Sequence, residues 1–599
     1  MVRYREDIDV MKGCGIIAIM LFHLGVLRSG YLGVDMFFVI NGFFIIPSII
    51  KNISEGNFSY VSFLEKRFVR LYPLVLIICA SAIVLGCIFM LPFELERTAR
   101  SAIACSVMSE NLRCAYTYGD YWEIWNDYSP LFHLWYVGIL FEFYLLFPLV
   151  LLIVKKYRKG KYSSSMMELA CGVLFLISIV CYFLPFDKSL KFYLLPFRLF
   201  EILAGGLIAI ALGKFDSERF ANNRILFKLS RVILILIIYS SILFVYQDGI
   251  GHQVRPIAPY NIGLKTEGLH FSPVIMQLMT VLASSFVLIY YTGTEGGMFY
   301  KLSSYIGKRS YSLFLWHQFV LAFYRNMVSD EITWTSVCVY FSVSFALSYL
   351  TYCLVEQKVR PRRSAVRFCV ISSLLMFIPS SYIYLNGGVI RDIPELNLKK
   401  GEGRPNITVA YVGIPVSFER KPFEDNGNKN VLVVGNSFAR DFCNILRESN
   451  YGKALNFSYC HDGYPSEITS EADYIFTFFP KETITDDIQR QLKESCQVYG
   501  IGTKTFGKSN NQFYSHRWSE SYFESKTQLP EEYRRANVLA KEHWGEHYID
   551  LIKPALTDSN HIRVFTPDHK YISQDCKHLT QAGAKWYASV LNLDKIFRQ

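Results

Sequence analysis

The hydrophobic pattern divides the chain into two unlike parts. Between residues 10 and 385, long apolar runs alternate with short polar connections. From residue 430 onward, short apolar segments alternate with amphipathic ones. A helix that crosses a bilayer needs about 20 mostly apolar residues, whereas alternating strands and helices are typical of an α/β fold. The pattern therefore predicts a multi-span helical membrane domain followed by an α/β domain outside the bilayer.

About eleven apolar runs are long enough to form membrane helices. They lie near residues 11–27, 33–50, 72–91, 134–155, 169–185, 192–212, 230–247, 273–291, 309–327, 333–354 and 366–385. The run 33–50 is interrupted by Asn41-Gly42 and contains Pro47, so we expect a broken or partly re-entrant helix there. The first run lacks a small-residue cleavage site and is expected to be a retained span. The predicted division is a membrane domain at 1–363, an additional membrane helix at 364–385, a Gly/Pro-containing extracytoplasmic linker at 386–428, and an α/β domain at 429–599.

Clusters of Lys and Arg indicate how the helices are oriented. The connections near 51–70, 155–161, 214–231, 301–309 and 358–367 are rich in basic residues, while the alternate connections hold few. Because cytoplasmic loops carry an excess of Lys and Arg, these connections and the N-terminus are expected on the cytoplasmic side. The same rule predicts an extracytoplasmic, or periplasmic, C-terminal domain.

Composition narrows the function classes. A net charge of +11 could suggest a nucleic-acid partner, but the basic residues sit between apolar runs, where they set topology. We therefore expect a lipid bilayer and no nucleic acid. The 14 cysteines contain no CxxC pair with metal-ligand spacing, and no metal is expected. Six cysteines fall in predicted extracytoplasmic segments, where disulfides are permitted but their pairing cannot be read: Cys105, Cys114, Cys443, Cys460, Cys496 and Cys576.

Three ionisable residues interrupt the first two predicted membrane helices: Lys12, His23 and Asp35. Such groups are costly inside a bilayer and are candidates for a functional site. Lys12 and His23 are separated by about 20° around a helix and about 16 Å along it. They therefore share one helix face. This stripe suggests a long anionic ligand whose reactive end lies at His23.

Several further motifs follow in order along the chain. They are Tyr4-Arg-Glu-Asp-Ile-Asp9, Gly33-Val-Asp35-Met-Phe-Phe-Val-Ile-Asn-Gly42-Phe, Phe63-Leu-Glu-Lys-Arg67-Phe-Val-Arg70-Leu-Tyr-Pro73, His133-Leu-Trp135, Phe192-Tyr-Leu-Leu-Pro-Phe-Arg198-Leu-Phe-Glu201, Ile306-Gly-Lys-Arg-Ser310-Tyr-Ser-Leu-Phe-Leu-Trp316-His317 and Val355-Glu356. Together with the Lys12–His23 spacing, they make residues 4–363 resemble the acyltransferase-3 family of integral-membrane O-acyltransferases.

The resemblance implies acetyl-coenzyme A as the acyl donor. Arg67 and Arg70 share a helix face at the cytoplasmic boundary and, with Lys12, suit the donor's phosphates. His23 would be the general base that activates an acceptor hydroxyl, or the nucleophile that takes the acyl group. Asp35 is expected to orient the His23 imidazole or tune its charge. A plainer interpretation makes Lys12, Arg67 and Arg70 ordinary topology anchors.

Two further histidines in these motifs, His133 and His317, lie beside Trp near the starts of predicted spans. A functional and a structural role are about equally expected for both, because hydrogen bonding at the membrane interface is a sufficient explanation. Family members often carry a Glu-rich segment after His-x-Trp, but here only Glu142 follows, and no catalytic role is assigned to it.

The last part of the chain predicts strands at 431–434, 474–478 and 498–501, with helices at 439–448 and 485–495, hence a parallel sheet. Gly435-Asn436-Ser437 and Asp575-Cys-Lys-His578 make it resemble the SGNH hydrolase and acyltransferase fold, fused as in bacterial surface-polysaccharide acetyltransferases. The resemblance implies Ser437 as nucleophile, His578 as its base and Asp575 as the residue that fixes the His578 tautomer. Asn436 replaces the usual Asp, and no Asn-bearing third block is visible, so Gly463 is the remaining candidate for an oxyanion donor.

These inferences combine into one predicted function. The protein would be a multi-pass O-acetyltransferase of the bacterial inner membrane that moves acetyl from cytoplasmic acetyl-CoA to a surface glycan, foremost lipopolysaccharide O-antigen or another lipid-linked glycan. Peptidoglycan is the alternative acceptor. Three other interpretations stay open: a transporter, a membrane protein whose outer domain only binds glycan, and an esterase that removes acetyl groups.

Overall fold

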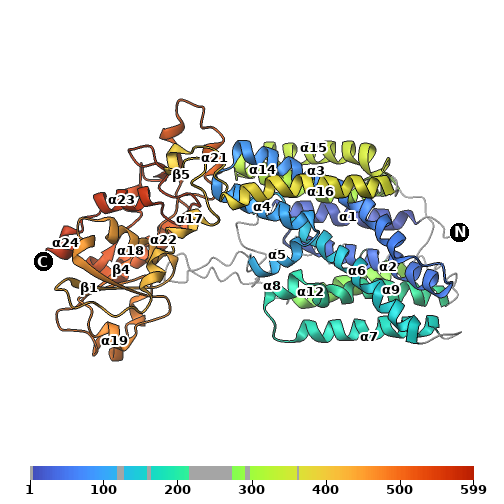
Figure 1. Cartoon of the computed structure of the whole chain (residues 1–599), viewed down its shortest axis with the longest axis horizontal. Helices are drawn as coiled ribbons and strands as arrows, with labels where there is room; N and C mark the ends of the chain where they lie inside the picture. Colours follow the sequence, from blue (N-terminus) through green and yellow to red (C-terminus); the bar gives the residue numbers. More distant parts are fainter. Residues whose placement is uncertain are drawn as a thin grey trace.

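The computed structural model describes residues 5–117, 127–157, 163–214, 273–289, 297–359 and 363–598, with Leu229 and Val232 in addition. A bundle of long helices forms one half of the molecule and an α/β domain the other (Figure 1). The first helix, α1 (Glu6–His23), begins at the end of the bundle that is remote from the α/β domain (Figure 1). The two predicted parts are therefore both seen.

The helical half follows the predicted spans closely. After α1 come α2 (Leu32–Ser54), α3 (Tyr60–Phe89), α4 (Pro92–Ser106), α5 (Glu110–Thr117), α6 (Trp135–Tyr157), α7 (Ser163–Phe183), α8 (Lys188–Tyr193), α9 (Leu195–Lys214), α12 (Pro273–Ile289), α13 (Met298–Gly307), α14 (Ser310–Met327), α15 (Trp334–Thr351) and α16 (Arg363–Leu385). Within the residues that the structure describes, 7 helical segments are long and apolar enough to cross a membrane. They correspond to α2, α3, α6, α7, α8 with α9, α15 with the turn after it, and α16.

The remaining predicted spans differ from this set for identifiable reasons. The runs 11–27 and 309–327 do form helices, α1 and α14, but these carry more polar residues. The run 273–291 forms the shorter α12. The run 230–247 lies outside the described residues except for Val232. Eleven membrane helices are thus not confirmed, although a multi-span helical domain is.

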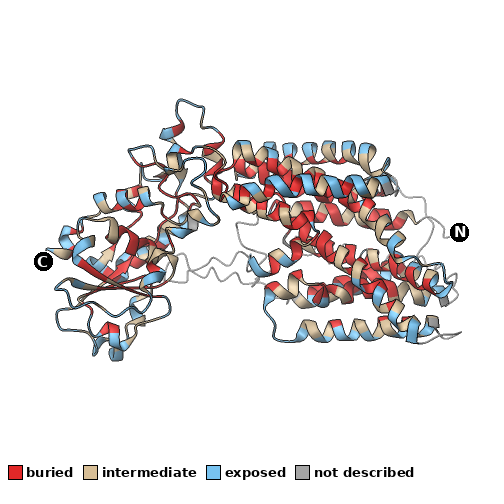
Figure 2. Ribbon diagram, in the orientation of Figure 1, coloured by how far each residue is buried: buried red, intermediate tan, exposed pale blue. Residues whose placement is uncertain are grey.

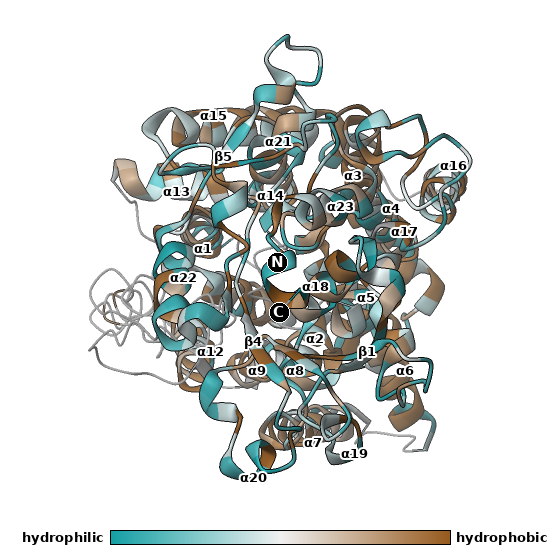
Figure 3. Ribbon diagram, turned by 90° about the vertical axis from the view of Figure 1, so that its left-hand side faces the viewer, coloured by the Kyte–Doolittle hydropathy of each residue, from teal (hydrophilic) through white to brown (hydrophobic). Residues whose placement is uncertain are grey.

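Helices at the edge of the bundle turn apolar side chains outward. Seen from the side of the α/β domain, α7, α15 and α16 lie at the periphery (Figure 3). Their outer faces are exposed while the bundle interior is buried (Figure 2). On α7 and α16 the exposed residues include Leu176, Val180, Leu375 and Ile378. Exposed apolar faces of this extent are expected where lipid, and not water, surrounds a protein.

Close packing of α2 against α9 depends on small residues. A Cβ on Gly42 would lie 1.7 Å from the carbonyl oxygen of Ile202, and one on Gly205 would lie 1.9 Å from that of Val39. Membrane helices approach closely through such positions because no side chain separates their backbones. The prediction that Asn41-Gly42 breaks this helix is therefore wrong. Instead, α2 is continuous from Leu32 to Ser54, with Pro47 inside it.

The connection after α3 is a helical pair and not the open loop that was expected. α4 packs against α3 and α16, and the Tyr72 hydroxyl, midway along α3, donates to the carbonyl oxygen of Ser106 at 2.5 Å. Because Ser106 ends α4, the pair folds back into the bundle. Cys105 and Cys114 are consequently buried. Among the described residues no disulfide involves either of them, nor any of the four cysteines of the α/β domain.

The α/β domain is built on a parallel sheet, as predicted. Its strands are β1 (Lys429–Val434), β2 (Leu455–Cys460), β3 (Tyr474–Thr477), β4 (Gln497–Ile501) and β6 (Tyr548–Ile549), in the order β2-β1-β3-β4-β6. Its longer helices are α18 (Ser437–Glu448), α22 (Glu531–Trp544) and α23 (Gln581–Val590), and β5 (Lys526–Gln528) pairs with β7 (His561–Arg563) in a small antiparallel sheet. The remaining helical turns are α17 (Ile407–Ala410), α19 (Ser466–Thr469), α20 (Asp486–Gln489), α21 (Asn511–Tyr514) and α24 (Asp594–Phe597).

Sequence reasoning overestimated one element of this domain and missed others. The helix predicted at 485–495 is only the single turn α20. β2, β6 and α22 were not predicted. The register of the main sheet is nevertheless clear, with Val431 beside both Phe457 of β2 and Tyr474 of β3. β1 is therefore an interior strand, and the turn at its carboxyl end lies at the centre of the sheet edge.

The segment expected to be a linker is folded between the two halves. The Arg391 guanidinium donates to the carbonyl oxygens of Cys87 and Met90 at the end of α3 and to the Tyr514 hydroxyl of the α/β domain. Farther along, Glu419 pairs with Tyr459 at the edge of the main sheet. Residues 386–428 thus fasten the two halves to each other.

Candidate functional site

The nucleophile turn follows β1 directly. Gly435 has φ +130, and a Cβ there would lie 2.9 Å from Cβ of Phe478, so glycine suits both the backbone and the space. Asn436 caps α18, since its side-chain oxygen accepts from the Phe438 backbone N–H at 2.9 Å. Ser437 is the first residue of α18. Its hydroxyl is thereby held at a helix N-terminus, where backbone N–H groups favour developing negative charge.

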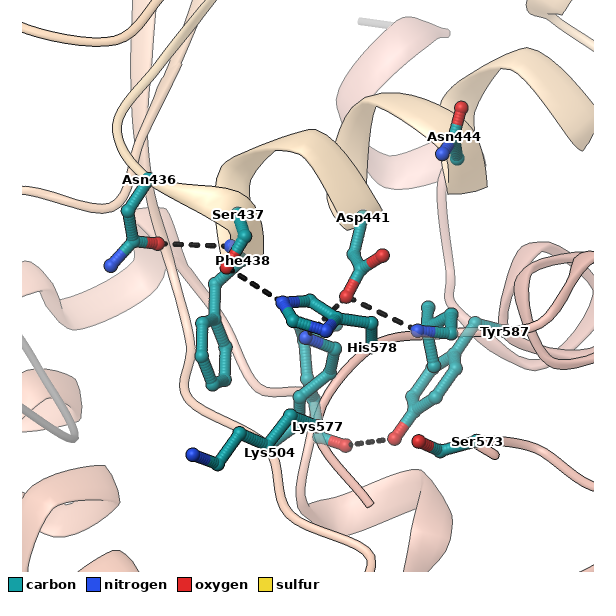
Figure 4. Close-up of polar contacts among 12 residues, drawn as sticks. Asn436, Ser437, Phe438, Asp441, Asn444, Lys504, Ser573, Lys577, His578 and Tyr587 are labelled. Atoms are coloured by element: carbon teal, nitrogen blue, oxygen red, sulfur yellow. Dashed lines mark hydrogen bonds and ion pairs between the residues drawn. The ribbon is translucent and has the colours of Figure 1, made fainter. Parts of the chain in front are cut away.

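Ser437, His578 and Asp575 form a continuous hydrogen-bonded triad. The Ser437 Oγ lies 2.8 Å from Nε2 of His578, and Nδ1 of His578 lies 2.6 Å from Oδ2 of Asp575 (Figure 4 shows the serine and the histidine). The other Asp575 oxygen accepts from the backbone N–H groups of Lys577 and His578 at 3.0 and 2.7 Å. The three residues that the sequence singled out are therefore brought together in the geometry of a serine nucleophile and its base.

The charges of the triad stabilise each other. Burial would raise the pKa of Asp575, but the charge and hydrogen bonds of His578 outweigh it and lower that pKa to about 2. Burial would lower the pKa of His578, but the neighbouring Asp575 carboxylate outweighs it and raises that pKa. His578 is therefore a stronger base than an ordinary imidazole, which suits the removal of a proton from Ser437.

A buried ion pair supports this triad from behind. Asp441 lies one turn after Ser437 on α18, and its carboxylate is 2.8 Å from the Lys504 ammonium and 3.2 Å from the backbone N of Leu579 (Figure 4). Neither charged group is appreciably exposed. Asp441 thus joins the nucleophile helix to the residue that follows His578. Sequence reasoning missed the pair, although the i, i+4 spacing of Ser437 and Asp441 was a usable signal.

Oxyanion donors are less fully defined. Gly463 has φ +155 with open space where a Cβ would be, and it follows β2 at the same edge of the sheet as Ser437. Its assignment as a donor stays a prediction. The Asn436 side-chain oxygen is already engaged by the cap on α18, so this atom serves the helix start.

A second centre lies inside the helical bundle, where three histidines converge. The ring centroids of His23 and His317 are 5.2 Å apart, and those of His133 and His317 are 5.4 Å apart. All three side chains are buried. His133 and His317 are therefore buried neighbours of the predicted catalytic histidine.

The hydrogen bonds of this centre are incomplete. Nδ1 of His317 lies 2.5 Å from the carbonyl oxygen of Phe314. Because a carbonyl only accepts, Nδ1 carries the proton and Nε2 presents a lone pair. That Nε2 atom, and both ring nitrogens of His133, are buried without a hydrogen-bond partner among the residues the structure describes. Buried polar atoms normally have partners, so these three nitrogens point to a ligand.

Asp35 has other partners than the predicted one. Its carboxylate lies 2.9 Å from the Arg198 guanidinium and accepts from Gln277 Nε2 at 3.2 Å. Arg198 also pairs with Glu201 at 3.0 Å. The prediction that Asp35 orients His23 is therefore wrong. The reason is the close α2–α9 contact, which directs Asp35 toward α9.

The predicted donor-binding residues gather near one another. Arg67 and Arg70 interact electrostatically, and so do Lys12 and Arg70. α3 starts at Tyr60, well before the predicted span, so both arginines lie on the membrane helix itself. Lys12 lies 3.3 Å from Asp9, whereas neither arginine has an ion pair in the described part of the chain. Two such neighbouring guanidinium groups are suited to an anion.

Comparison with known proteins agrees with this arrangement. The family model described as "Acyltransferase domain", that of the acyltransferase-3 family, matches residues 5–353. The chain belongs to the acyltransferase-3 family. The prediction of an acyltransferase from the sequence is thereby confirmed at the level of the family, and His23, His133 and His317 all lie within the matched acyltransferase domain.

Two relatives illustrate how far the similarity to acyltransferase-3 proteins extends. The chain is 26% identical over 402 residues to O-acetyltransferase OatA of Staphylococcus aureus strain MRSA252, covering 64% of this chain and 63% of that protein. It is also 26% identical over 367 residues to OatA of strain NCTC 8325 / PS 47, covering 60% of this chain and 58% of the relative. The alignments thus span less than two thirds of these relatives. No solved structure matches the chain.

Proposed function

We propose that the protein is a membrane O-acetyltransferase that transfers acetyl from cytoplasmic acetyl-CoA to a hydroxyl of a glycan outside the membrane. The observation that carries the proposal is the histidine centre of the acyltransferase domain. Three buried imidazoles meet there, and several of their nitrogens lack partners in the described structure. His23 stands at the end of the helix that carries Lys12 near its start.

The donor would bind with its phosphates at Lys12, Arg67 and Arg70. The guanidinium groups suit phosphate because they offer paired N–H donors in one plane. About 16 Å of helix separates Lys12 from His23, a distance that an extended pantetheine arm spans. This placement supports a thioester delivered to His23 from the cytoplasmic side.

His23 would act as the nucleophile at this thioester. Its ring nitrogen forms a bond to the acetyl carbon while the carbon–sulfur bond breaks, and the coenzyme leaves as a thiolate that takes up a proton. The Nε2 lone pair of His317, whose ring centroid lies 5.2 Å from that of His23, would accept the proton that His23 loses and pass it to the thiolate. The product is a neutral acetyl-imidazole, which is reactive enough to pass the acetyl group on to a hydroxyl.

The outer domain, which we assign to the SGNH type, would complete the transfer. His578 takes the proton of Ser437 as the serine oxygen bonds to the acetyl carbon and the bond to His23 breaks. That proton then passes to the departing His23 nitrogen, so both imidazoles are neutral again before the second half of the transfer. In the second half, the glycan hydroxyl attacks the Ser437 ester, its proton passes to His578, and the serine oxygen is released and reprotonated. The triad distances support this step.

The acceptor we favour is lipopolysaccharide O-antigen, with peptidoglycan as the second candidate. Both are extracytoplasmic glycans with free hydroxyls. The bacterial inner-membrane location is part of the proposal, and the positive-inside rule supports an N-terminus in the cytoplasm and an outer domain in the periplasm. This orientation is supported by the position of the α/β domain at the end of the bundle opposite the start of α1 (Figure 1).

The test is glycan O-acetylation in cells that carry His23→Ala or Ser437→Ala. Mass spectrometry of purified lipopolysaccharide and peptidoglycan measures acetyl content on each polymer. We expect loss of acetyl in both variants, and the polymer that loses it identifies the acceptor. His547→Ala, an exposed outer-domain histidine, is the matched control.

Other results would lead to other functions. Unchanged acetylation in His23→Ala would remove the transferase proposal. Full acetylation with Ser437→Ala would reduce the outer domain to glycan binding. Increased acetylation with Ser437→Ala would instead identify an esterase, because the cell would then have lost an activity that removes acetyl groups.

A further inference from the structure

One segment of the outer domain, residues 508–517, lies against the outer end of α14. We call it the strap. Its turn α21 contacts α14 (Figure 1). The side-chain contacts are Lys508 with Asp330 at 2.8 Å, Ser509 and Asn511 with Oδ1 of Asn326 at 2.9 Å each, Gln512 with the Val328 carbonyl oxygen at 2.9 Å, and Ser515 with the Met327 carbonyl oxygen at 3.0 Å.

The strap supplies hydrogen-bond donors to the carbonyl groups at the end of α14. The last carbonyl groups of any helix have no partner within the helix. Here the Met327 carbonyl accepts from Ser515, and that of Val328, the residue after α14, accepts from Gln512. The end of a helix in the acyltransferase domain is thus capped by side chains of the outer domain.

The centre of this contact is buried on both sides. Asn326 and Asn511 are each 1% exposed. Asn511 also accepts from the backbone N of Leu91, at the junction of α3 and α4, at 2.7 Å. Buried amides must be hydrogen-bonded to be tolerated. The Asn326 side-chain nitrogen donates within the bundle, to Tyr128 and Ala322, but its Oδ1 and both polar atoms of the Asn511 side chain have their partners in the opposite domain. The contact therefore specifies one docked position and not a loose association.

The strap also reaches the outer triad. The Asn510 side chain donates to the carbonyl oxygen of Ser573 at 2.6 Å, and the Ser573 hydroxyl lies 3.3 Å from Oδ1 of Asp575. Glu94, at the start of α4, is close enough to Asp575 to interact with it electrostatically. The Asp575–His578 loop therefore faces the bundle through the strap.

On the other side, the same contact reaches the histidine centre. Arg325 precedes Asn326 on α14, and its guanidinium donates to the carbonyl oxygen of His23 at 2.8 Å. α14 also carries His317. Three hydrogen bonds, joined by the sequence neighbours Arg325–Asn326 and Asn510–Asn511, thus link His23 to Ser573 beside the triad.

We propose that the strap is an intramolecular docking element that registers the Ser437 triad with the His23 centre, so that the acetyl group passes directly between them. The inference rests on the proposed function, because it needs an acetyl group that visits both centres. Asn326 and Asn511 are positioning residues. They act on neither half-reaction by themselves but on the passage from one centre to the other.

The test compares two routes by which Ser437 can be acetylated, which we call charging: from acetyl-CoA through the His23 centre, and directly from a soluble ester. The full chain, in lipid nanodiscs, is treated either with acetyl-CoA or with p-nitrophenyl acetate, and acetyl on Ser437 is measured by peptide mass spectrometry. For Asn326→Ala and Asn511→Ala we expect charging from acetyl-CoA to fall at least about tenfold, the effect of losing one to two hydrogen bonds. Charging from p-nitrophenyl acetate should stay within about twofold, because the ester reaches the triad without crossing the bundle.

Matched variants keep this result interpretable. Asn428→Ala removes an outer-domain asparagine whose amide contacts Lys453 at 3.4 Å, away from the strap, and should change neither reaction. Asn326→Gln retains an amide, with an oxygen that can accept from Ser509 and Asn511 and N–H groups that can donate to Tyr128 and Ala322. It should keep more acetyl-CoA charging than Asn326→Ala. Rescue of this kind is not expected from a residue that only fills space.

Two results would overturn the inference. Equal losses in both reactions would show that the strap only holds the outer domain folded, and undiminished charging from acetyl-CoA would show that docking is not needed. Failure of the proposed function looks different, because His23→Ala would then leave acetyl-CoA charging of Ser437 intact. If His23→Ala abolishes charging and the Asn variants do not, the strap alone is refuted.

Discussion

The two histidine-containing centres of this protein differ in how complete they are. In the outer domain, His578 has a hydrogen-bond partner on each ring nitrogen, Ser437 on one side and Asp575 on the other. In the bundle, His133 has no partner on either nitrogen and His317 has one only on Nδ1, within the described structure. One centre is assembled by its own side chains, and the other is not.

This difference indicates where a ligand contributes most. Leaving a buried polar atom without a partner costs about 1–3 kcal/mol. The outer triad avoids this cost and is ready to react with whichever acyl group reaches it. In the bundle, several histidine nitrogens of the described structure bear this cost. Under the proposed function, substrate binding there would satisfy these nitrogens and complete the site. Such a cost is expected at functional positions more than elsewhere.

The assembled centre should be the more sensitive to loss of a partner. Asp575→Asn leaves the triad shape but removes the acceptor that holds the proton on His578 Nδ1. By analogy with other serine triads, we expect the rate of Ser437 acylation by p-nitrophenyl acetate to fall about 10⁴-fold. Stopped-flow release of p-nitrophenol measures it, with Asp568→Asn, on the outer domain but outside the triad, as the control.

The residual activity of Asp575→Asn should also move along the pH axis. His578 must be neutral to accept a proton, so activity rises as pH passes its pKa. Asp575 raises that pKa. Its replacement therefore lowers the pKa, and the rising limb of the pH–rate profile shifts to lower pH. A limb that stays in place would mean that Asp575 does not control the charge of His578.

For the incomplete centre, the sharpest test is His317→Ala. It removes the Nε2 lone pair beside His23, and loss of a positioned base costs typically 10²–10⁴-fold. We expect transfer from acetyl-CoA to the glycan to fall about 10²-fold, while acylation of Ser437 by p-nitrophenyl acetate is unaffected. If both reactions fall together, His317 is a packing residue of the bundle.

The residues proposed to bind the phosphates of acetyl-CoA allow a further test of the bundle. Arg67→Ala and Arg70→Ala each remove one guanidinium from a pair that forms no salt bridge in the described structure, although Arg70 interacts electrostatically with Glu356. Since a hydrogen bond to a charged group contributes about 1.5–3 kcal/mol, KM for acetyl-CoA should rise roughly ten- to a hundredfold in each variant. The value of kcat should change little, and Lys66→Ala, an exposed neighbour on α3, should change neither constant. Equal falls in kcat would argue against phosphate binding.

The amino-acid pattern was sufficient where chemistry is local. Ser437 follows a short apolar strand and a glycine, and Asp575 and His578 are three residues apart. These two short motifs carried the resemblance from which the three residues were singled out, and the structure brings their side chains together. The parallel sheet followed from strand–helix alternation. The Lys12–His23 stripe needed only the helical repeat.

Long-range packing set the limit of such predictions. His133 and His317 are far apart in sequence, and only the bundle brings them to His23. The partner predicted for Asp35 was wrong because the face that α2 turns toward α9 depends on Gly42 and Gly205, whose contacts are tertiary. The helices α4 and α5 were not predicted because their mixed polarity suits a solvated connection as well as a helical pair folded into the bundle.

The smallest effect on the reaction is expected at the ion pair behind the triad, where replacement of both charges tests whether the outer centre needs charge there or only shape. Asp441→Asn alone leaves Lys504 buried without its partner, which costs about 3–5 kcal/mol of unfolding free energy. The double variant Asp441→Leu with Lys504→Met removes both charges, and replacement of a buried pair by apolar residues of similar volume is often neutral.

Asp441 raises the pKa of His578 and Lys504 lowers it, so their joint removal should move the rising limb of the pH–rate profile by less than about one pH unit. Chemical denaturation and the p-nitrophenyl acetate profile of all three variants, Lys504→Met included, measure both quantities. A double variant as unstable as Asp441→Asn would show that the bond from Leu579 to Asp441, and not the balance of charge, holds α18 to the His578 loop.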